Sequence, residues 1–122
     1  MSNKPVAERL QVKDGRHLAV LGASPDLNHA VGAVEARIEL QQADVVLLVA
    51  PHLAALEAAL PTMLAEASKT AILWVAYPKL GSSLALDLSR DIIRALVPRY
   101  YLDTVSQIAI DADWSALRLK RT

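Results

Sequence analysis

The stretch ADVVLLVAP, residues 43–51, decides the fold class of this chain. Its consecutive large apolar residues do not alternate with polar ones, which is typical of a strand buried on both faces. Two runs of the same kind, HLAVLG at 17–22 and AILWVAYP at 71–78, lie on either side of it in the sequence. Such strands occur in parallel sheets that helices cover. We therefore predict three parallel, adjacent strands, with the strand that begins near Asp44 in the centre.

Helical patterns separate and follow these strands. Between residues 53 and 68 apolar side chains recur at helical spacing, and Pro61 inside that pattern predicts a kinked helix or two short helices. A further helix is predicted over 87–97, with Asp87 or Ser89 as its N-cap, and a short one near the N-terminus, with Asn3 as its N-cap. Residues 22–30 predict a loop, whereas residues 33–40 are compatible with either a strand or a helix.

The C-terminal residues predict an antiparallel hairpin. Two short runs are joined by Asp111-Ala112-Asp113, and the second run alternates, with leucines at 117 and 119 and cations at 118 and 120. Together these elements predict a single α/β domain over residues 1–122. Its fold class is a three-layer, Rossmann-like, mostly parallel sheet with a C-terminal antiparallel hairpin.

Composition and charge exclude several classes of protein. The 122 residues include 13 Lys and Arg and 13 Asp and Glu, so the formal net charge is +0, and neither nucleic acid nor a membrane is expected as a partner. The chain has no cysteine, which excludes disulfides and zinc–thiolate sites and fits a reducing cytoplasm. The charged start MSNKPVAERLQ is not typical of a signal peptide, and the apolar runs are too short to cross a bilayer. We expect a cytoplasmic protein.

No cofactor or metal is predicted. The turn after the first strand has one glycine, Gly22, where a dinucleotide-binding loop needs three, and the chain contains no P-loop motif. The three histidines have no metal-ligand spacing. No serine lies in a GxSxG motif. His52 could reach Ser24 across neighbouring strand ends, but a solvated loop histidine is the favoured interpretation, so no catalytic residue is assigned.

Polar and small residues follow the strands at the edge of the sheet where open α/β sheets bind ligands. The candidate ligand or interaction site consists of Gly22, Ser24, His52, Tyr77, Lys79, Ser82, Asp87 and Trp114. Trp114 is interpreted as an edge lid or a partner surface, and Trp74 as a core residue.

Lys79 has two interpretations. In the first it forms a salt bridge with Asp87 or Asp91 and ties the strand exit to the next helix. In the second it binds an anion together with backbone N–H groups of the Ser82-Ser83 loop, or lowers the pKa of Tyr77. The sequence narrowly favours the salt bridge, because both acids lie near the start of that helix.

The segments LWVAYPK, DLSRDIIRAL and VSQIAIDADWSALRLKR resemble a small bacterial family known only as a domain of unknown function. ADVVLLVA resembles the central strand of that family. The resemblance covers residues 43–121 well and the first third loosely. It implies that six residues belong to a family pattern: Pro78, Lys79, Asp87, Trp114, Ser115 and Arg118. It brings no established activity, so no catalytic residue follows from it.

More distantly, the order of elements resembles a shortened class I methyltransferase sheet. Those enzymes carry GxGxG after the first strand and an acid at the end of the second. Here there is one glycine, no full helix is evident between the first two strands, and Glu35 or Glu39 would have to supply the acid. The sequence therefore predicts that S-adenosylmethionine is not bound.

Three functional hypotheses follow. The first is a non-enzymatic α/β module that binds a small ligand or a protein, as a homodimer or larger homo-oligomer, because 53% of the residues are hydrophobic and the net charge is zero. The second is an enzyme that uses Tyr77, Lys79 and His52 on a small carboxylate or phosphate substrate. The third is a degenerate methyltransferase-like scaffold without its cofactor.

Overall fold

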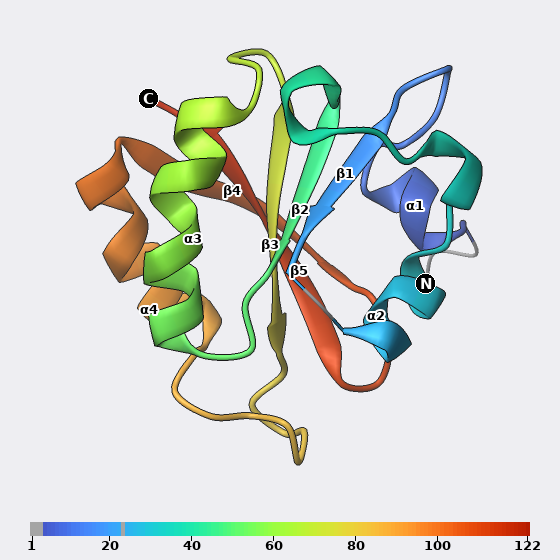
Figure 1. Ribbon diagram of the computed structural model, residues 1–122. Helices are drawn as coiled ribbons and strands as arrows, with labels where there is room; N and C mark the ends of the chain where they lie inside the picture. The colour runs from blue at the N-terminus through green and yellow to red at the C-terminus, as the bar shows by residue number, and fades with distance from the viewer. Residues whose placement is uncertain (1–3, 23) are drawn as a thin grey trace.

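The computed structural model describes residues 4–22 and 24–122, which form one five-stranded sheet in the order β1-β2-β3-β5-β4 (Figure 1). The strands are β1 Leu18–Leu21, β2 Val45–Val49, β3 Ile72–Pro78, β4 Leu102–Ala109 and β5 Trp114–Arg121. The first three are parallel with β2 in the centre, and β5 is antiparallel to both β3 and β4. The predicted α/β fold class, parallel strand order and closing hairpin are confirmed.

Helices cover both faces of the sheet, which gives three layers (Figure 1). Helices α3 (Leu53–Glu66) and α4 (Arg90–Leu96) lie on one face, and α1 (Val6–Arg9) and α2 (Pro25–Val31) lie on the other. Three 3₁₀ helices complete the chain: η1 Val34–Ala36, η2 Leu40–Gln42 and η3 Val97–Tyr100.

Each face of the sheet has its own apolar core, because β2 and β3 present large side chains alternately to the two sides. Leu48 and Val75 pack with α3 and α4, whereas Leu47 and Trp74 pack with α1 and α2. The buried Trp74 ring also donates its indole N–H to the carbonyl oxygen of Leu10, 3.0 Å away. Burial of a side chain of this size typically stabilises by about 1.5–3 kcal/mol, and the hydrogen bond fixes α1 against the sheet.

The loop predicted over residues 22–30 is wrong, because α2 begins within it. The Ser24 hydroxyl accepts a hydrogen bond from the Leu27 N–H, and Pro25 occupies the first turn, where its missing N–H is not needed. Residues 33–40 form neither a strand nor an α-helix; they contain η1 and the start of η2. A helix therefore lies between the first two strands, contrary to the sequence-based expectation.

Two further predictions about helices left alternatives open, and the structure selects one alternative of each pair. Helix α3 is one helix that continues through the exposed Pro61, not two short ones. Ser89, not Asp87, is the N-cap of α4, since its hydroxyl accepts a hydrogen bond from the Ile92 N–H. The N-terminal helix is confirmed as α1, but Asn3, its predicted N-cap, lies outside the described residues.

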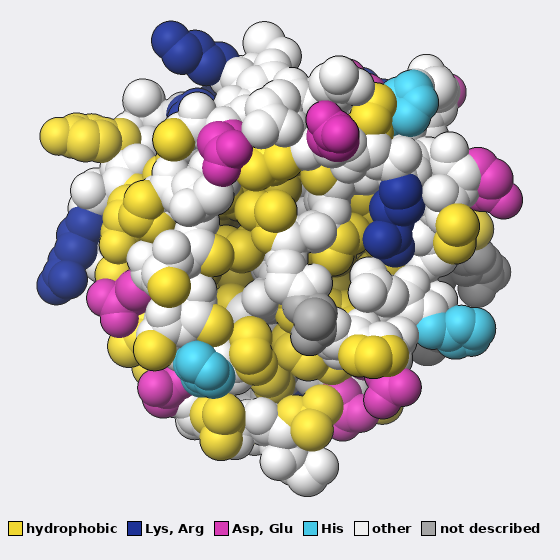
Figure 2. Space-filling model, in the orientation of Figure 1, with side chains coloured by type: hydrophobic (Ala, Val, Ile, Leu, Met, Phe, Trp, Pro, Cys, Tyr) yellow, Lys and Arg dark blue, Asp and Glu magenta, His cyan; other side chains and the backbone are white. Residues whose placement is uncertain are grey.

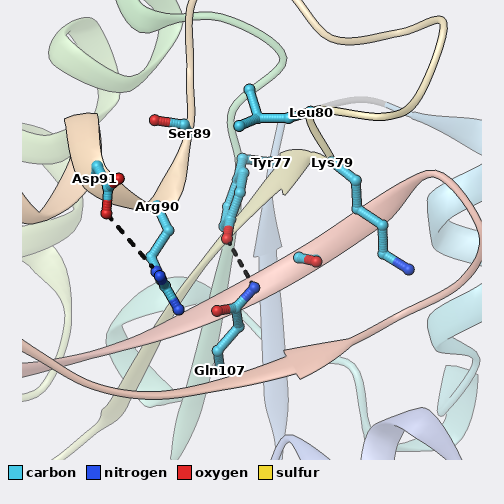
Figure 3. A pocket seen from close by; sticks show the side chains of 8 residues that line it. Tyr77, Lys79, Leu80, Ser89, Arg90, Asp91 and Gln107 are labelled. Carbon is cyan, nitrogen blue, oxygen red and sulfur yellow. Dashed lines mark hydrogen bonds and ion pairs between the residues drawn. The ribbon is translucent and has the colours of Figure 1, made fainter.

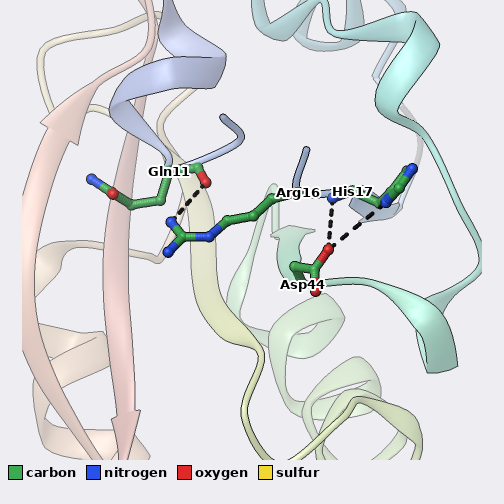
Figure 4. A network of polar contacts seen from close by, with 4 residues as sticks. All are labelled: Gln11, Arg16, His17 and Asp44. Atoms are coloured by element: carbon green, nitrogen blue, oxygen red, sulfur yellow. Dashed lines mark hydrogen bonds and ion pairs between the residues drawn. The ribbon is translucent and has the colours of Figure 1, made fainter. Parts of the chain in front are cut away.

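A polar contact joins the entrances of β1 and β2 (Figure 4). The Asp44 carboxylate accepts a hydrogen bond from the His17 N–H at 2.8 Å, and its Oδ2 lies 3.8 Å from the His17 ring Nδ1. Nearby, the Arg16 guanidinium donates to the Gln11 carbonyl oxygen at 3.3 Å. These contacts lie at the amino ends of the parallel strands and leave the carboxyl ends as the place to look for a ligand site.

Candidate functional site

A depression of about 230 Å³ lies where β3 ends and α4 begins (Figure 3). Strand β3 and the residues just after it, the start of α4, and the two hairpin strands all contribute to it. Its lining residues are Tyr77, Lys79, Leu80, Ser89, Arg90, Asp91, Gln107 and Ser115.

Tyr77 forms the floor of this depression. Its hydroxyl oxygen accepts a hydrogen bond from the Gln107 side-chain amide at 3.0 Å. Burial raises the pKa of the Tyr77 phenol above 10.0, and this effect outweighs the opposing influence of the Arg90 charge and the Ser115 hydroxyl. The phenol therefore stays protonated at neutral pH, and its own O–H is a neutral hydrogen-bond donor.

The predicted salt bridge of Lys79 with Asp87 or Asp91 is wrong. The Lys79 ammonium instead donates to the carbonyl oxygen of Asp111 at 2.6 Å, and the Lys79 backbone N–H donates to the Asp113 carbonyl oxygen at 2.8 Å. The reason is the antiparallel register of β5, which pairs Pro78 with Trp114 and brings the hairpin turn beside the exit of β3. Figure 3 shows the ammonium extending away from Tyr77.

Ser82 also serves the hairpin turn and not the depression. Its hydroxyl donates to the Asp113 carboxylate at 2.7 Å and accepts from the Leu84 N–H at 3.0 Å. The Asp111 carboxylate in turn accepts from the N–H groups of Asp113 and Trp114. The loop after β3 is thus tied to the hairpin at several points.

His52 and Asp87 both cap α3. The ring Nδ1 of His52 accepts a hydrogen bond from the Ala55 N–H at 3.2 Å, so the ring is not a freely solvated histidine and is not bonded to Ser24. The Asp87 carboxylate accepts from the Leu53 N–H at 2.7 Å. A carboxylate of the chain itself therefore occupies the helix N-terminus, a position that attracts anions.

Gly22 and Ser24 lie at the end of β1, two strands away from Tyr77. Gly22 has φ +98°, and a Cβ added to it would lie 2.8 Å from the Val49 carbonyl oxygen. Trp114 is buried with the core residues that face α1 and α2, so neither predicted role as a lid or a partner surface is met within this fold.

The structure therefore brings two of the eight predicted site residues, Tyr77 and Lys79, to the depression. It adds residues that sequence reasoning missed, above all Arg90 and Gln107. The Arg90 guanidinium and the Gln107 amide extend toward the Tyr77 hydroxyl (Figure 3). A second depression of about 200 Å³ shares Arg90 and Gln107 and adds Arg94, one helical turn further along α4. The sequence did offer one signal for Arg90: it directly follows Ser89, a predicted helix N-cap, and so begins the helix after β3.

Arg90 has a carboxylate neighbour, Asp91, but the ion pair between them is long and exposed. Its polar contact is with Asp91, 3.9 Å from Arg90 Nε to Asp91 Oδ1, between side chains that are 53% and 83% exposed. A pair with such exposure contributes little, about 0–1 kcal/mol. The guanidinium nitrogens thus remain available to an anion beside the Tyr77 hydroxyl.

The part of the chain that the structure describes, 4–22 and 24–122, contains no cluster of three or more acids and histidines that could hold a metal ion. Within the same residues, no helix combines the length and the apolar character that crossing a bilayer requires.

The fold of this chain is similar to those of two solved structures. Over 96% of its length the chain superposes on the crystal structure of the Bacillus subtilis M1A22 tRNA methyltransferase TrmK, with a TM-score of 0.58 and 10% identity. Over 94% of its length it superposes on LepI in complex with SAM, with a TM-score of 0.52 and 12% identity. The chain has a methyltransferase-like fold. It spans 64% of the TrmK chain and 38% of the LepI chain. No protein-family model matches the sequence, and no curated protein matches it.

Proposed function

We propose that this chain is a non-enzymatic binding module that holds a small carboxylate or phosphate in the depression at the end of β3. The observation that carries the proposal is the Arg90 guanidinium, whose ion pair with Asp91 is long and exposed, beside the neutral Tyr77 hydroxyl. An anion placed between them would accept a charge-assisted hydrogen bond from Arg90 and a second hydrogen bond from the phenol.

The same geometry argues against catalysis at this site. Because its pKa is raised, Tyr77 is not a base at neutral pH. The Lys79 ammonium is held by a backbone carbonyl oxygen, so it neither activates the phenol nor approaches a substrate as a nucleophile. Of the three residues on which the enzymatic hypothesis rests, Tyr77 is thus a hydrogen-bond donor, Lys79 a structural cation and His52 a helix cap.

The methyltransferase-like fold is, in this proposal, a scaffold without the cofactor. Three features at the end of β1 disfavour a nucleotide. The Val49 carbonyl oxygen crowds Gly22, Pro25 removes one N–H from the start of α2, and Asp26 places a negative charge in its first turn. A phosphate-bearing nucleotide gains from helix N–H groups and loses near a like charge, so Pro25 and Asp26 disfavour it. S-adenosylmethionine carries no phosphate, and against it the proposal rests on the single, crowded glycine of this turn. The proposal does not extend the activities of TrmK or LepI to this chain.

Residues shared with the uncharacterised bacterial family lie at the same depression. Lys79 and Ser115, two residues of the family pattern, line the depression, and Asp87 anchors the loop that precedes Arg90. We propose membership of that family. If the depression is the shared site, aligned members should retain a hydroxyl at position 115 and a cation at position 90.

A second copy of the chain is the proposed protein partner. Three leucines, Leu80, Leu84 and Leu86, are 72%, 46% and 68% exposed on the loop between β3 and α4. Several large exposed apolar side chains on one loop are a candidate interaction surface. Sedimentation at high micromolar concentration should show a dimer, and a Leu84→Ser/Leu86→Ser variant should be monomeric; a wild-type monomer at that concentration would exclude this partner.

The test of ligand binding is a titration followed by backbone amide NMR, with acetate, succinate and inorganic phosphate as probes. Shifts are expected at Tyr77, Arg90, Gln107 and Ser115. Arg90→Gln should weaken binding at least tenfold, as loss of a charge-assisted hydrogen bond implies, while Arg99→Gln, at the far end of the sheet, should not. Equal affinity of Arg90→Gln and wild type for every probe would refute the proposed site.

A further inference from the structure

A third depression lies at the opposite end of the sheet from Tyr77, beside the C-terminal end of β5. Its volume of about 490 Å³ is larger than that of the Tyr77 depression and falls in the range of small-molecule sites. The last turns of α3, the 3₁₀ helix η3 and the end of β5 form it. Its lining residues are Leu64, Ala65, Arg99, Tyr100, Tyr101, Arg121 and Thr122.

Tyr101 presents its ring to solvent on a fixed backbone. The residue is 78% exposed and has φ +59°, in the left-handed region that non-glycine residues rarely adopt. Its N–H donates to the Pro98 carbonyl oxygen at 3.1 Å, and its own carbonyl oxygen accepts from the Thr122 N–H at 3.0 Å. Tyr100 beside it is partly buried and packs against the core. The Tyr100 ring is therefore held by packing, and the backbone of Tyr101 is fixed while its ring is solvated.

Two arginines flank these rings. The Arg121 guanidinium donates to the Leu64 carbonyl oxygen at 3.3 Å, while its Nε is enclosed without a hydrogen-bond partner. Arg99 is exposed. Among the described residues, neither of the two ion pairs involves Arg99 or Arg121. Both charges are thus without an acidic partner within salt-bridge distance.

More cations lie next to this depression. An adjoining depression of about 200 Å³ shares Arg121 and is also lined by Lys69, Arg118 and Lys120. Four cations, Lys69, Arg118, Lys120 and Arg121, thus line this adjoining depression, which the balanced net charge of the chain does not reveal. The C-terminal end of the chain lies at the upper left of Figure 1, and both hydrophobic and basic side chains project from that side in Figure 2.

We propose that this end of the molecule is a second ligand site, which takes a small molecule with a planar aromatic ring and an anionic group. The tyrosine rings supply a surface on which a planar ring stacks. The two arginines supply the charge that an adjacent carboxylate or phosphate requires, and an arginine can also stack on an aromatic face. Leu64 and Ala65 supply apolar contact at the base.

The test uses two ring-bearing anions, adenosine monophosphate and indole-3-acetate, with their neutral counterparts adenosine and indole-3-acetamide. Each is titrated into the full chain while backbone amide shifts are recorded. Each anion is expected to shift residues 64–65, 99–101 and 121, and to bind at least tenfold more tightly than its neutral counterpart. Equal affinity of the charged and neutral forms would exclude a role for the arginines. Shifts confined to Tyr77 and Gln107 would assign the ligand to the other depression, and no shifts at all would overturn the proposal.

Variants then separate the contributions of ring and charge. Tyr101→Asn removes the ring but tolerates the left-handed backbone, and Arg99→Gln removes one charge; each should weaken binding at least tenfold. Arg16→Gln is the matched control: it removes an exposed arginine that lines neither depression, and it should bind both anions as wild type does. Circular dichroism and thermal unfolding of each variant exclude loss of fold as the cause. Unchanged affinity in folded Tyr101→Asn and Arg99→Gln would refute the site.

Discussion

The Asp87 carboxylate and the Leu53 backbone N–H form a hydrogen bond of 2.7 Å between residues that are 34 positions apart in the sequence. The bond joins the loop before α4 to the first residue of α3. Because a helix N-terminus carries partial positive charge and unpaired N–H groups, a carboxylate there is stabilising. Asp87 is therefore a structural anion that fills a position otherwise open to a ligand.

Asp87→Ala should lower the free energy of unfolding by about 1 kcal/mol, the usual magnitude for loss of a helix cap. Asp87→Asn keeps an acceptor but loses the charge, so its effect should be smaller. Asp91→Ala is the control: its carboxylate has only the exposed, 3.9 Å contact with Arg90, and stability should change little. Urea unfolding measures all three, and equal stability of Asp87→Ala and Asp91→Ala would contradict the cap assignment.

Gly22→Ala should destabilise the chain by about 2 kcal/mol or more. The added methyl would meet the Val49 carbonyl oxygen at 2.8 Å, in addition to the unfavourable φ of +98°; steric overpacking alone typically costs about 1–3 kcal/mol. Gly15→Ala isolates the backbone contribution, since Gly15 also has positive φ (+82°) but no atom within 4 Å of an added Cβ. A Gly22→Ala variant no less stable than Gly15→Ala would show that the close approach to β2 is unimportant.

Lys79→Met should cost about 0.5–1.5 kcal/mol, because it removes the hydrogen bond to the Asp111 carbonyl oxygen while keeping most of the apolar stem. Anion binding at the Tyr77 depression should persist in this variant, since the ammonium extends away from Tyr77. Chemical denaturation and the phosphate titration are measured on the same sample. Loss of binding with unchanged stability would instead favour the ligand role of Lys79.

The sequence was informative where the pattern itself determines burial. The unbroken apolar runs around Val46 and Val75 are short, rich in β-branched residues and bounded by proline, which favours strands covered on both faces, and strand type and order follow from them. The hydrogen-bond partners of individual side chains are harder to predict from the sequence. Lys79 was assigned to acids near in sequence, whereas its partner Asp111 lies 32 residues away and is brought close by the register of β5.

Two other misses have equally specific causes. Pro25 was interpreted as part of a loop, although Ser24 before it and the first turn after it are the usual start of a helix. Gln107 was not singled out because the face on which a strand residue lies depends on pairing, and the register of β4 with β5 shifts between Thr104 and Ser106. No pattern in the sequence of β4 specifies that irregularity.

S-adenosylmethionine at millimolar concentration should leave the melting temperature unchanged. A cofactor present at 100 times its dissociation constant would stabilise the fold by about 2.7 kcal/mol, a shift of several degrees for a domain of this size. The turn after β1 has one glycine, Gly22, which the Val49 carbonyl oxygen crowds, so the glycine-rich loop that would approach the adenosyl group is missing. Thermal unfolding with and without the cofactor decides the question, and a shift of several degrees would restore the cofactor-binding hypothesis.

Stability at alkaline pH should depend on Tyr77. Burial raises the pKa of its phenol above 10.0, so the folded chain holds this proton more tightly than the unfolded chain does. The stabilising contribution is complete below pH 10 and is lost as the pH rises from the unfolded pKa toward the higher folded one. The absorbance of tyrosinate should therefore include one late-titrating component among the three tyrosines.

Tyr77→Phe should remove that late component and flatten the fall in stability above pH 10, whereas Tyr101→Phe should leave the late component in place. The variant also tests the role of the phenol in binding, because it keeps the ring and loses only the hydroxyl that accepts from Gln107. Its affinity for phosphate should fall while Arg90 still contributes. A late component that persists in Tyr77→Phe would mean that another tyrosine holds its proton in the folded state, and Tyr77 would then not be the neutral donor of the site.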